Sequence, residues 1–206
     1  MNIKHKILAL LSLVTNFTQT LATDTQNIFD NSMKQSIDSS SISYKTPHDR
    51  IIITLTPSDC DGASKNCNGR YRNEVRTSCD KTFSASVCLP NFVDTMSSSR
   101  FFHIIQLKSP SYNHPLFTLG YYKDDLVLYT FSTRHILIGS TSEYDQRCIQ
   151  VDLQVQNGGK YIDYNVDGKS GSIVLPDYHY AYFKFGLYTN YKIKSILQNS
   201  FKVDCT

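Results

Sequence analysis

The stretch YFKFGLY, residues 182–188, has the pattern of a β-strand with two unlike faces. Side chains of a strand alternate between its faces, so every second residue belongs together. One face is apolar and carries Phe183, Phe185 and Leu187. The other face is polar and carries Tyr182, Lys184, Gly186 and Tyr188. The apolar face predicts a place in a hydrophobic core, and the polar face suggests one wall of a binding groove in which Gly186 leaves room for a ligand.

Short segments of the same kind fill the chain from Arg50 onward. They are rich in Ile, Val, Tyr, Phe and Thr and are separated by Gly, Pro, Asn, Asp and Ser clusters. Only 191–199 could form one short helix. We therefore expect an all-β fold, an antiparallel β-sandwich or jelly roll of the concanavalin A-like type. The expected strands are 50–56, 71–77, 82–89, 101–108, 116–122, 125–131, 134–140, 148–156, 160–166, 180–188 and 201–205.

The N-terminus has the layout of a secretory signal peptide. Lys4 and Lys6 precede an apolar run over 7–14, and small and polar residues follow up to Ala22. We expect a signal peptide at 1–22, a polar leader at 23–49 and one jelly-roll domain at 50–206. The apolar run is too short to span a bilayer. The sequence thus predicts a secreted, soluble protein without a membrane partner, which we expect to be a monomer.

The six cysteines agree with export, because an even number in an exported chain is typical of disulfides. We expect three bonds, and the spacing suggests Cys60–Cys67, Cys79–Cys88 and Cys148–Cys205, although six cysteines allow fifteen pairings. No C-x-x-C or H-x-x-x-H spacing indicates a metal site. Asp124 and Asp125 could be calcium ligands or loop solubilisers, and no calcium motif is present.

The net charge does not indicate a polyanionic partner by itself. The formal charge is +3, and loss of Lys4 and Lys6 with the signal peptide leaves +3 − 2 = +1. Nucleic acid is therefore not expected as a partner, and an anionic ligand must be argued from local clusters of charge.

Two segments carry such clusters. In YRNEVR, residues 71–76, one face presents Arg72, Glu74 and Arg76. This row is either a solvated ladder of ion pairs or a set of guanidinium groups that Glu74 holds ready for a carboxylate. In FFHIIQLK, residues 101–108, strict alternation puts Gln106 and Lys108 on one face, where amide and ammonium can bind a carboxylate.

The same alternation puts His103 on the opposite, more apolar face of that segment. We interpret it as a core or edge histidine and not as a catalyst.

Together, RNEVR, QLK and YFKFGLY resemble, in this order, three signature blocks of the jelly-roll polysaccharide lyases. Family 7 alginate lyases carry R-[ST]-E-[LV]-R, Q-[IV]-H and Y-F-K-A-G-x-Y. The stretch 86–109 is also similar to the related family 20 glucuronan lyases. The resemblance covers roughly 50–205 and implies a secreted lyase that cleaves 4-linked polyuronates, glucuronan-like or alginate-like, by β-elimination, without a required cofactor.

The resemblance also implies roles for single residues. Tyr188 corresponds to the catalytic tyrosine, and Gln106 and Arg72 to groups that neutralise the uronate carboxylate. Substrate contacts are implied for Glu74, Arg76, Lys184 and, less directly, Lys108. Tyr180 and Tyr182 share the face of Tyr188, and their rings could stack on sugars. One position departs from the family, because Lys108 stands where family 7 has a histidine.

The base therefore stays open. A free phenol has a pKa of about 10 and is a weak base at neutral pH, but nearby cations favour the phenolate. His135 and His179 are further candidates for the base. The alternative is a secreted protein of the same fold that binds an acidic polysaccharide without cleaving it.

Overall fold

The computed structural model describes residues 33–36, 42–45, 50–59, 71–90, 101–130, 135–190, 193 and 195–204, with the backbone alone for the first two segments. The expected signal peptide lies outside the described residues. No helix in the described part of the chain is long and apolar enough to cross a membrane.

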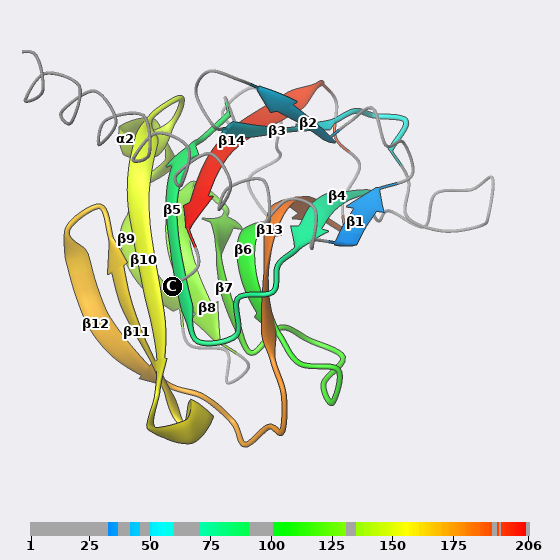
Figure 1. Ribbon diagram of the computed structural model, residues 1–206. Helices are drawn as coiled ribbons and strands as arrows, with labels where there is room; N and C mark the ends of the chain where they lie inside the picture. The colour runs from blue at the N-terminus through cyan, green and yellow to red at the C-terminus, as the bar shows by residue number, and fades with distance from the viewer. Residues whose placement is uncertain are drawn as a thin grey trace, which may run out of the picture.

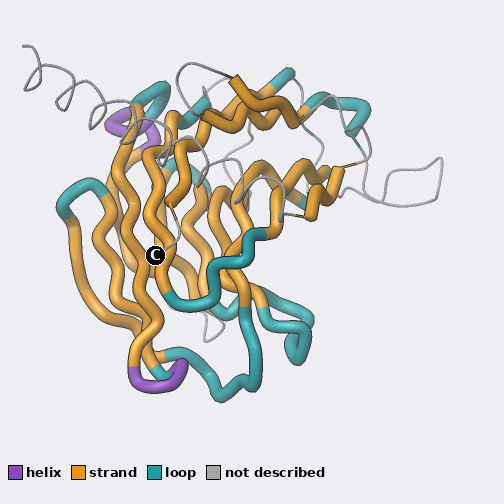
Figure 2. The backbone as a smooth tube through the Cα atoms, in the orientation of Figure 1, coloured by secondary structure: helices purple, strands orange, loops and turns teal. Residues whose placement is uncertain are grey.

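The described strands form two antiparallel sheets packed face to face, and strands make up most of the described residues (Figures 1 and 2). The first sheet has the order β1 (Met33–Ser36), β4 (Tyr71–Arg76), β13 (Tyr182–Thr189), β6 (Phe101–Lys108), β7 (Phe117–Tyr122), β8 (Asp125–Thr130) and β9 (His135–Ser140). The second has the order β12 (Lys169–Val174), β11 (Tyr161–Val166), β10 (Cys148–Gln156), β5 (Thr82–Cys88), β14 (Leu197–Asp204), β3 (Arg50–Leu55) and β2 (Ile42–Lys45).

Only short helical elements interrupt the described strands. The helix α2 (Thr141–Tyr144) follows β9, and the 3-10 turn η2 (Asn157–Gly159) follows β10. Ser140 caps α2, since its hydroxyl accepts a hydrogen bond from the backbone of Glu143. The all-β sandwich expected from the sequence is therefore confirmed.

The core lies between the two sheets and is built from their inward faces. Phe183 and Phe185 of β13 are fully buried, as are Phe83 of β5 and Phe201 of β14. The ring centroids of Phe83 and Phe183 are 5.1 Å apart, and those of Phe185 and Phe201 are 4.9 Å apart. These contacts fix the apolar face of β13 toward the second sheet, so its polar face points away from the core.

The structure contains strands that the sequence pattern did not predict. Two lie within the expected leader, where β1 pairs with β4 and β2 pairs with β3. A third is β12, whose sequence KSGSIV has exposed Ser and Gly positions and no clear alternation. The expected short helix was wrong where it is described, because 197–199 begin β14 and pair with β3.

One disulfide bond joins the middle of the second sheet. Cys88 of β5 and Cys148 of β10 are cross-strand partners with Cα atoms 3.8 Å apart. The expected pairs Cys79–Cys88 and Cys148–Cys205 were therefore wrong. The residues from Thr82 to Cys88 form one continuous strand, so Cys79 and Cys88 lie near its opposite ends.

The pairing of the other four cysteines is not described. Cys79 is disulfide-bonded, and the predicted pair Cys60–Cys67 lies outside the described residues.

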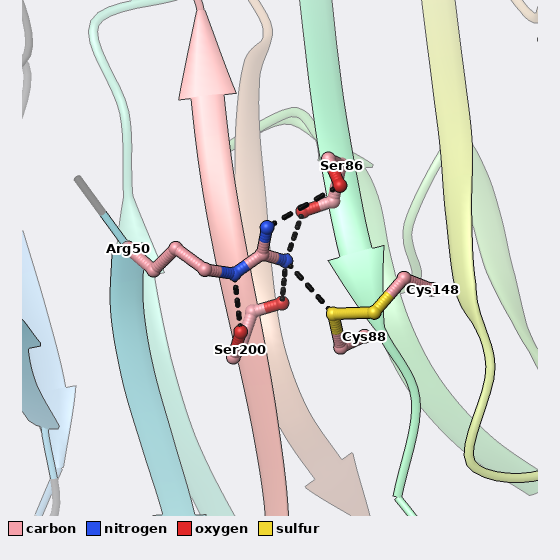
Figure 3. The surroundings of a disulfide bond; sticks show 5 residues. All are labelled: Arg50, Ser86, Cys88, Cys148 and Ser200. Carbon is pink, nitrogen blue, oxygen red and sulfur yellow. Dashed lines mark hydrogen bonds between the residues drawn. A yellow bond between two sulfur atoms is a disulfide. The ribbon is translucent and has the colours of Figure 1, made fainter. Parts of the chain in front are cut away.

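An arginine spans three strands beside this disulfide (Figure 3). The guanidinium of Arg50 donates to the backbone oxygens of Ser86 and Ser200, at 2.9 and 3.0 Å, and lies 3.1 Å from the sulfur of Cys88. Burial lowers the pKa of Arg50 from its usual value. The side chain thus links β3, β14 and β5 on the outer face of the second sheet.

Candidate active site

The three sequence blocks lie on adjacent strands of the first sheet, with β13 between β4 and β6. The register pairs Tyr188 with Arg72, Lys184 with Gln106, and Tyr182 with Lys108. Directly paired residues project to the same face of a sheet. We call this outward face of the first sheet the site face.

Glu74 is the centre of the polar cluster on the site face. Its carboxylate accepts a 2.5 Å hydrogen bond from the amide of Gln106 and lies 3.3 Å from Nε of Arg72 and 3.7 Å from Nζ of Lys184. Glu74, Gln106 and Lys184 are 2%, 5% and 6% exposed. The solvated-ladder interpretation of β4 was therefore wrong for Glu74, because this carboxylate is buried and bonded to three different side chains.

Arg76 occupies the end of the cluster near the beginning of β13. Its guanidinium stacks 3.8 Å from the ring centroid of Tyr182 and donates to the hydroxyl of Tyr180 at 3.1 Å. Tyr180 and Tyr182 are ring neighbours, with centroids 5.9 Å apart. Tyr180 and Tyr182, which the sequence placed on the face of Tyr188, thus contact the charged row of β4 through Arg76.

Lys108 stands at the position of the family histidine, and its ammonium is turned toward the β6–β7 loop. It donates to the backbone oxygens of Tyr112 and His114. Burial, followed by repulsion from Lys184 and Arg72, lowers the pKa of Lys108 from its usual value. An ammonium has three donors, so one remains for a ligand.

Tyr188 lies at the other end of the cluster and is partly exposed. Its hydroxyl donates to the side-chain oxygen of Asn190 at 2.5 Å, and its ring centroid lies 4.8 Å from the guanidinium carbon of Arg72. The ring of His103 is 5.0 Å away. The phenol therefore sits between a cation and an imidazole.

The predicted face of His103 was wrong, because this side chain lies on the site face. The pairing of β6 is irregular between His103 and Ile105 on its β7 side, and β13 is irregular between Phe185 and Tyr188 on its β6 side. Such a bulge inserts one residue and reverses the alternation beyond it. Phe101 and His103 thereby join Gln106 and Lys108 on one face.

The sequence contained a signal for this bulge. Strict alternation would mix Phe102 and Ile104 with Gln106 and Lys108 on a single face, whereas one extra residue at position 104 separates apolar from polar. Gly120, the β7 partner of His103, is a second signal. A Cβ atom there would lie 2.1 Å from the backbone oxygen of Phe102, so only glycine allows the close approach of β7.

His103 remains uncharged at neutral pH. Burial, followed by the charge of Arg72, lowers the pKa of its imidazole from 6.5 to about 3. Nδ1 lies 3.3 Å from the hydroxyl of Thr118, a fully buried residue of β7. The imidazole can exchange hydrogen bonds with Thr118, and a ring so hard to protonate is a weak base.

Gly186 was expected to leave room for a ligand, and the structure gives it a different role. Its φ is +148°, and a Cβ atom would lie 2.3 Å from the backbone oxygen of Asn73. The missing side chain therefore makes room for the backbone of β4 and not for a sugar. Pairing of Gly186 with Glu74 then fixes where the central carboxylate stands.

The two further histidines proposed as the base, His135 and His179, stand apart from Tyr188. His135 is on β9, four strands from β13, which at ~4.8 Å per strand is roughly 19 Å. His179 is exposed and lines a cavity of about 420 Å³ with Tyr178, Tyr180 and Lys81, at the start of β13. His135 is therefore too far from Tyr188 to act on the same sugar atom, and His179 precedes β13 whereas Tyr188 lies near the end of that strand.

The described residues contain no group of three or more His, Cys, Asp or Glu side chains that could hold a metal ion. Asp124 belongs to the β7–β8 turn, where its backbone oxygen accepts from the backbone of Thr141. This gives the Asp124–Asp125 pair a place in a surface turn.

Solved structures share the fold of this chain. An alginate lyase from Pseudomonas aeruginosa superposes with a TM-score of 0.62 at 17% identity, over 82% of this chain and 87% of that chain. The fold is that of the alginate lyases of polysaccharide lyase family 7.

Two further alginate lyases support the same likeness. One from Corynebacterium gives a TM-score of 0.61 at 13% identity, with 82% of each chain covered. The alginate lyase AlyC3 in complex with dimannuronate gives 0.59 at 16% identity, over 82% of this chain and 78% of that chain. No family model and no curated protein matches the sequence. At these identities the likeness to alginate lyases extends to the fold.

Proposed function

We propose that this protein is a secreted polysaccharide lyase that cleaves a 4-linked polyuronate by β-elimination. The observation that carries the proposal is the gathering of Arg72, Gln106 and Tyr188 on one face around the buried Glu74. Three separate sequence segments contribute to it, in a fold shared with alginate lyases.

The first chemical requirement is neutralisation of the uronate carboxylate. The proton on C5 is weakly acidic while the adjacent carboxylate keeps its full negative charge, and the charge grows toward an enolate as the proton leaves. Arg72 and the second N–H of the Gln106 amide are the donors proposed for this carboxylate. Glu74 holds both groups in place before substrate arrives, which lowers the cost of their reorganisation.

The second requirement is proton transfer. In the proposed step the C5–H bond breaks and its proton passes to the oxygen of Tyr188 as phenolate. The electron pair forms the C4–C5 double bond, the C4–O4 bond breaks, and O4 leaves with a proton from the same phenol when both groups lie on one side of the ring. Arg72 lies against the Tyr188 ring, with its guanidinium carbon 4.8 Å from the ring centroid.

His103 is the other proton acceptor within reach of that site, and we assign it the lesser part. Its low pKa makes the neutral imidazole a weak base. Its proposed role is to pack against the Tyr188 ring and hold the phenol at a fixed distance from the sugar.

A substrate panel tests the activity. Purified protein is incubated with polymannuronate, polyguluronate and polyglucuronate while the ultraviolet absorbance of the unsaturated product is followed. We expect absorbance to rise with at least one polymer. No rise with any of the three, in a sample shown to be folded, would refute the lyase assignment.

The second candidate function is binding of an acidic polysaccharide without cleavage. It is favoured by Lys108, which replaces the family histidine and directs its ammonium to the loop. Measurable binding of a polyuronate by the unmodified protein, together with no product in the panel, would select this function.

A further inference from the structure

Four aromatic rings form a second cluster on the site face, on the far side of His103 from Tyr188. They belong to four successive strands: Phe101 of β6, Tyr122 of β7, Tyr129 of β8 and His135 of β9. Centroid distances are 6.1 Å for Phe101–Tyr122, 5.4 Å for Phe101–Tyr129, 4.6 Å for Tyr122–His135 and 5.1 Å for Tyr129–His135. We call these four residues the aromatic shelf.

The register places the shelf on the same face as the charged cluster. Gln106 pairs with Thr118, Thr118 with Tyr129, and Tyr129 with His135. Phe101 pairs with Tyr122. The strands β6, β7 and β8 run side by side in Figure 1, so the shelf continues the site face across the sheet.

The shelf is open to solvent and not part of the core between the sheets. Phe101, Tyr122 and Tyr129 are partly exposed and His135 is exposed. Leu137, which pairs with Val127 of the same face, is 61% exposed at the edge strand. Exposed apolar and aromatic area of this kind is typical of a surface that binds a partner.

Ring contacts make the shelf continuous with the proposed reaction centre. Phe101 lies 4.5 Å from His103, and His103 lies 5.0 Å from Tyr188, between ring centroids. From β13 to β9 there are four inter-strand steps of ~4.8 Å, or roughly 19 Å. A sugar chain that crosses the strands from Tyr188 therefore reaches the shelf.

The two halves of the site face differ in charge. On β4 and β13 the cations Arg72, Arg76 and Lys184 lie around Glu74. The shelf contains no Lys, Arg, Asp or Glu, and the ammonium of Lys123 lies 5.4 Å from the centroid of the Tyr122 ring. The charged half can bind carboxylates, whereas the aromatic rings of the shelf present flat faces on which the C–H face of a pyranose can stack.

We propose that the aromatic shelf is a second sugar-binding site, which stacks pyranose rings of the same acidic polysaccharide that lie beyond the residue held at Tyr188. This inference rests on the proposed substrate class, because the occupant is taken to be a longer stretch of that polymer. The shelf recognises the ring faces, and its contribution is independent of salt. It gives the protein a preference for long chains over short ones.

Binding of oligomers of different length tests the shelf. The variant Tyr129→Leu keeps an apolar strand residue and removes the ring, and Tyr161→Leu on β11 of the second sheet is the matched control. Both are made together with Tyr188→Phe, so that no oligomer is consumed. Dissociation constants for dimers and hexamers of mannuronate and glucuronate are measured by calorimetry at two salt concentrations, and thermal unfolding checks the fold.

We expect Tyr129→Leu to weaken hexamer binding roughly tenfold, equal to about 1.4 kcal/mol. Dimer binding and the salt dependence stay unchanged, and Tyr161→Leu binds as its parent does. Equal hexamer affinity in both variants, or an equal loss for dimer and hexamer, would overturn the inference, as would a parent that binds neither hexamer.

The outcomes separate this inference from the proposed function. A shelf variant that loses hexamer binding, in a protein that makes no unsaturated product, supports the shelf and refutes the lyase. A protein that makes the product and shows no effect of Tyr129→Leu supports the lyase and refutes the shelf.

Discussion

Replacement of Glu74 by glutamine is the most informative single change, because one buried carboxylate holds three groups of the site. The variant keeps the size and shape of the side chain and removes its charge. Gln106 loses a charged acceptor, and Lys184 and Arg72 lose their common counter-ion. Lys184 is the most affected, since it is 6% exposed and its ammonium stays out of water.

The size of the effect follows from the two charge separations. At 3.7 Å and an effective dielectric constant of about 20, the Lys184–Glu74 attraction is roughly 4.5 kcal/mol, and the Arg72–Glu74 attraction at 3.3 Å is roughly 5 kcal/mol. Desolvation offsets much of each attraction. Removal of one partner of a buried pair costs about 3–5 kcal/mol, so we expect Glu74→Gln to lose about 3 kcal/mol of unfolding free energy.

Urea unfolding followed by circular dichroism measures this loss, and initial rates on the polyuronate that the wild type cleaves measure the effect on turnover. Misplacement of Arg72 and Gln106 should reduce kcat/KM about a hundredfold. The double variant Glu74→Gln/Lys184→Met is the control. Because it removes both charges, its stability should return to within about 1 kcal/mol of the wild type while turnover stays low.

Two results would refute this reasoning. An unfolding midpoint for Glu74→Gln equal to that of the wild type would mean that the carboxylate is not the counter-ion of a buried ammonium. A double variant that is less stable than Glu74→Gln would mean that Lys184 stabilises the fold through other contacts.

Three further changes test other parts of the structure. Gly186→Ala should lose roughly 3 kcal/mol of unfolding free energy, because the added Cβ would meet the backbone of β4. The control Gly158→Ala has a positive φ but no atom near the added Cβ, and it should lose about 1 kcal/mol. Equal losses in urea unfolding would contradict this. Removal of the Cys88–Cys148 bond by a double alanine variant should lower stability by about 4 kcal/mol for a separation of 60 residues, seen as a lower urea midpoint, and an unchanged midpoint would refute it. His103 stays neutral in the folded protein, while the unfolded chain binds a proton below about pH 6.5, so stability should fall as pH drops from about 6.5 toward 3, by on the order of 2–4 kcal/mol. His103→Gln should flatten that part of the profile, and a profile identical to the wild type would show that His103 titrates normally.

Strand positions could be predicted from the sequence because alternation and turn residues are local signals. The bounds of β6 and β10 agree with the pattern at both ends, and the faces of β13 are as predicted. The ordered blocks placed Arg72, Gln106 and Tyr188 on one face for the same reason. No irregularity separates Arg72 or Gln106 from the rest of its block, and β13 keeps a regular register with β4 from Lys184 to Tyr188.

His103 could not be placed by alternation alone. A bulge moves every residue beyond it to the opposite face of the sheet. The irregular pairing involves β6 with both β7 and β13, so the sequence of β6 alone does not reveal it. In the sequence, only the apolar pair Ile104–Ile105 and the glycine at position 120 indicate the bulge.

Other features depend on partners far away in sequence. The strands β1 and β2 form because an edge of each sheet is available to them, and their own sequences carry little alternation. Pairing of Cys88 with Cys148 likewise follows from the register of β5 with β10, which no spacing along the chain reveals.

The most direct test of the proposed function measures the mass and the ultraviolet absorbance of the products formed by the wild type and by Tyr188→Phe. The substrate is the polyuronate of the panel that gives the wild type its highest absorbance. We predict wild-type products that absorb in the ultraviolet and whose new ends lack the elements of water, because elimination adds none. Tyr188→Phe should bind the polymer as tightly and form product at least a hundredfold more slowly. Products that have gained water, or a Tyr188→Phe variant as fast as the wild type, would contradict the account.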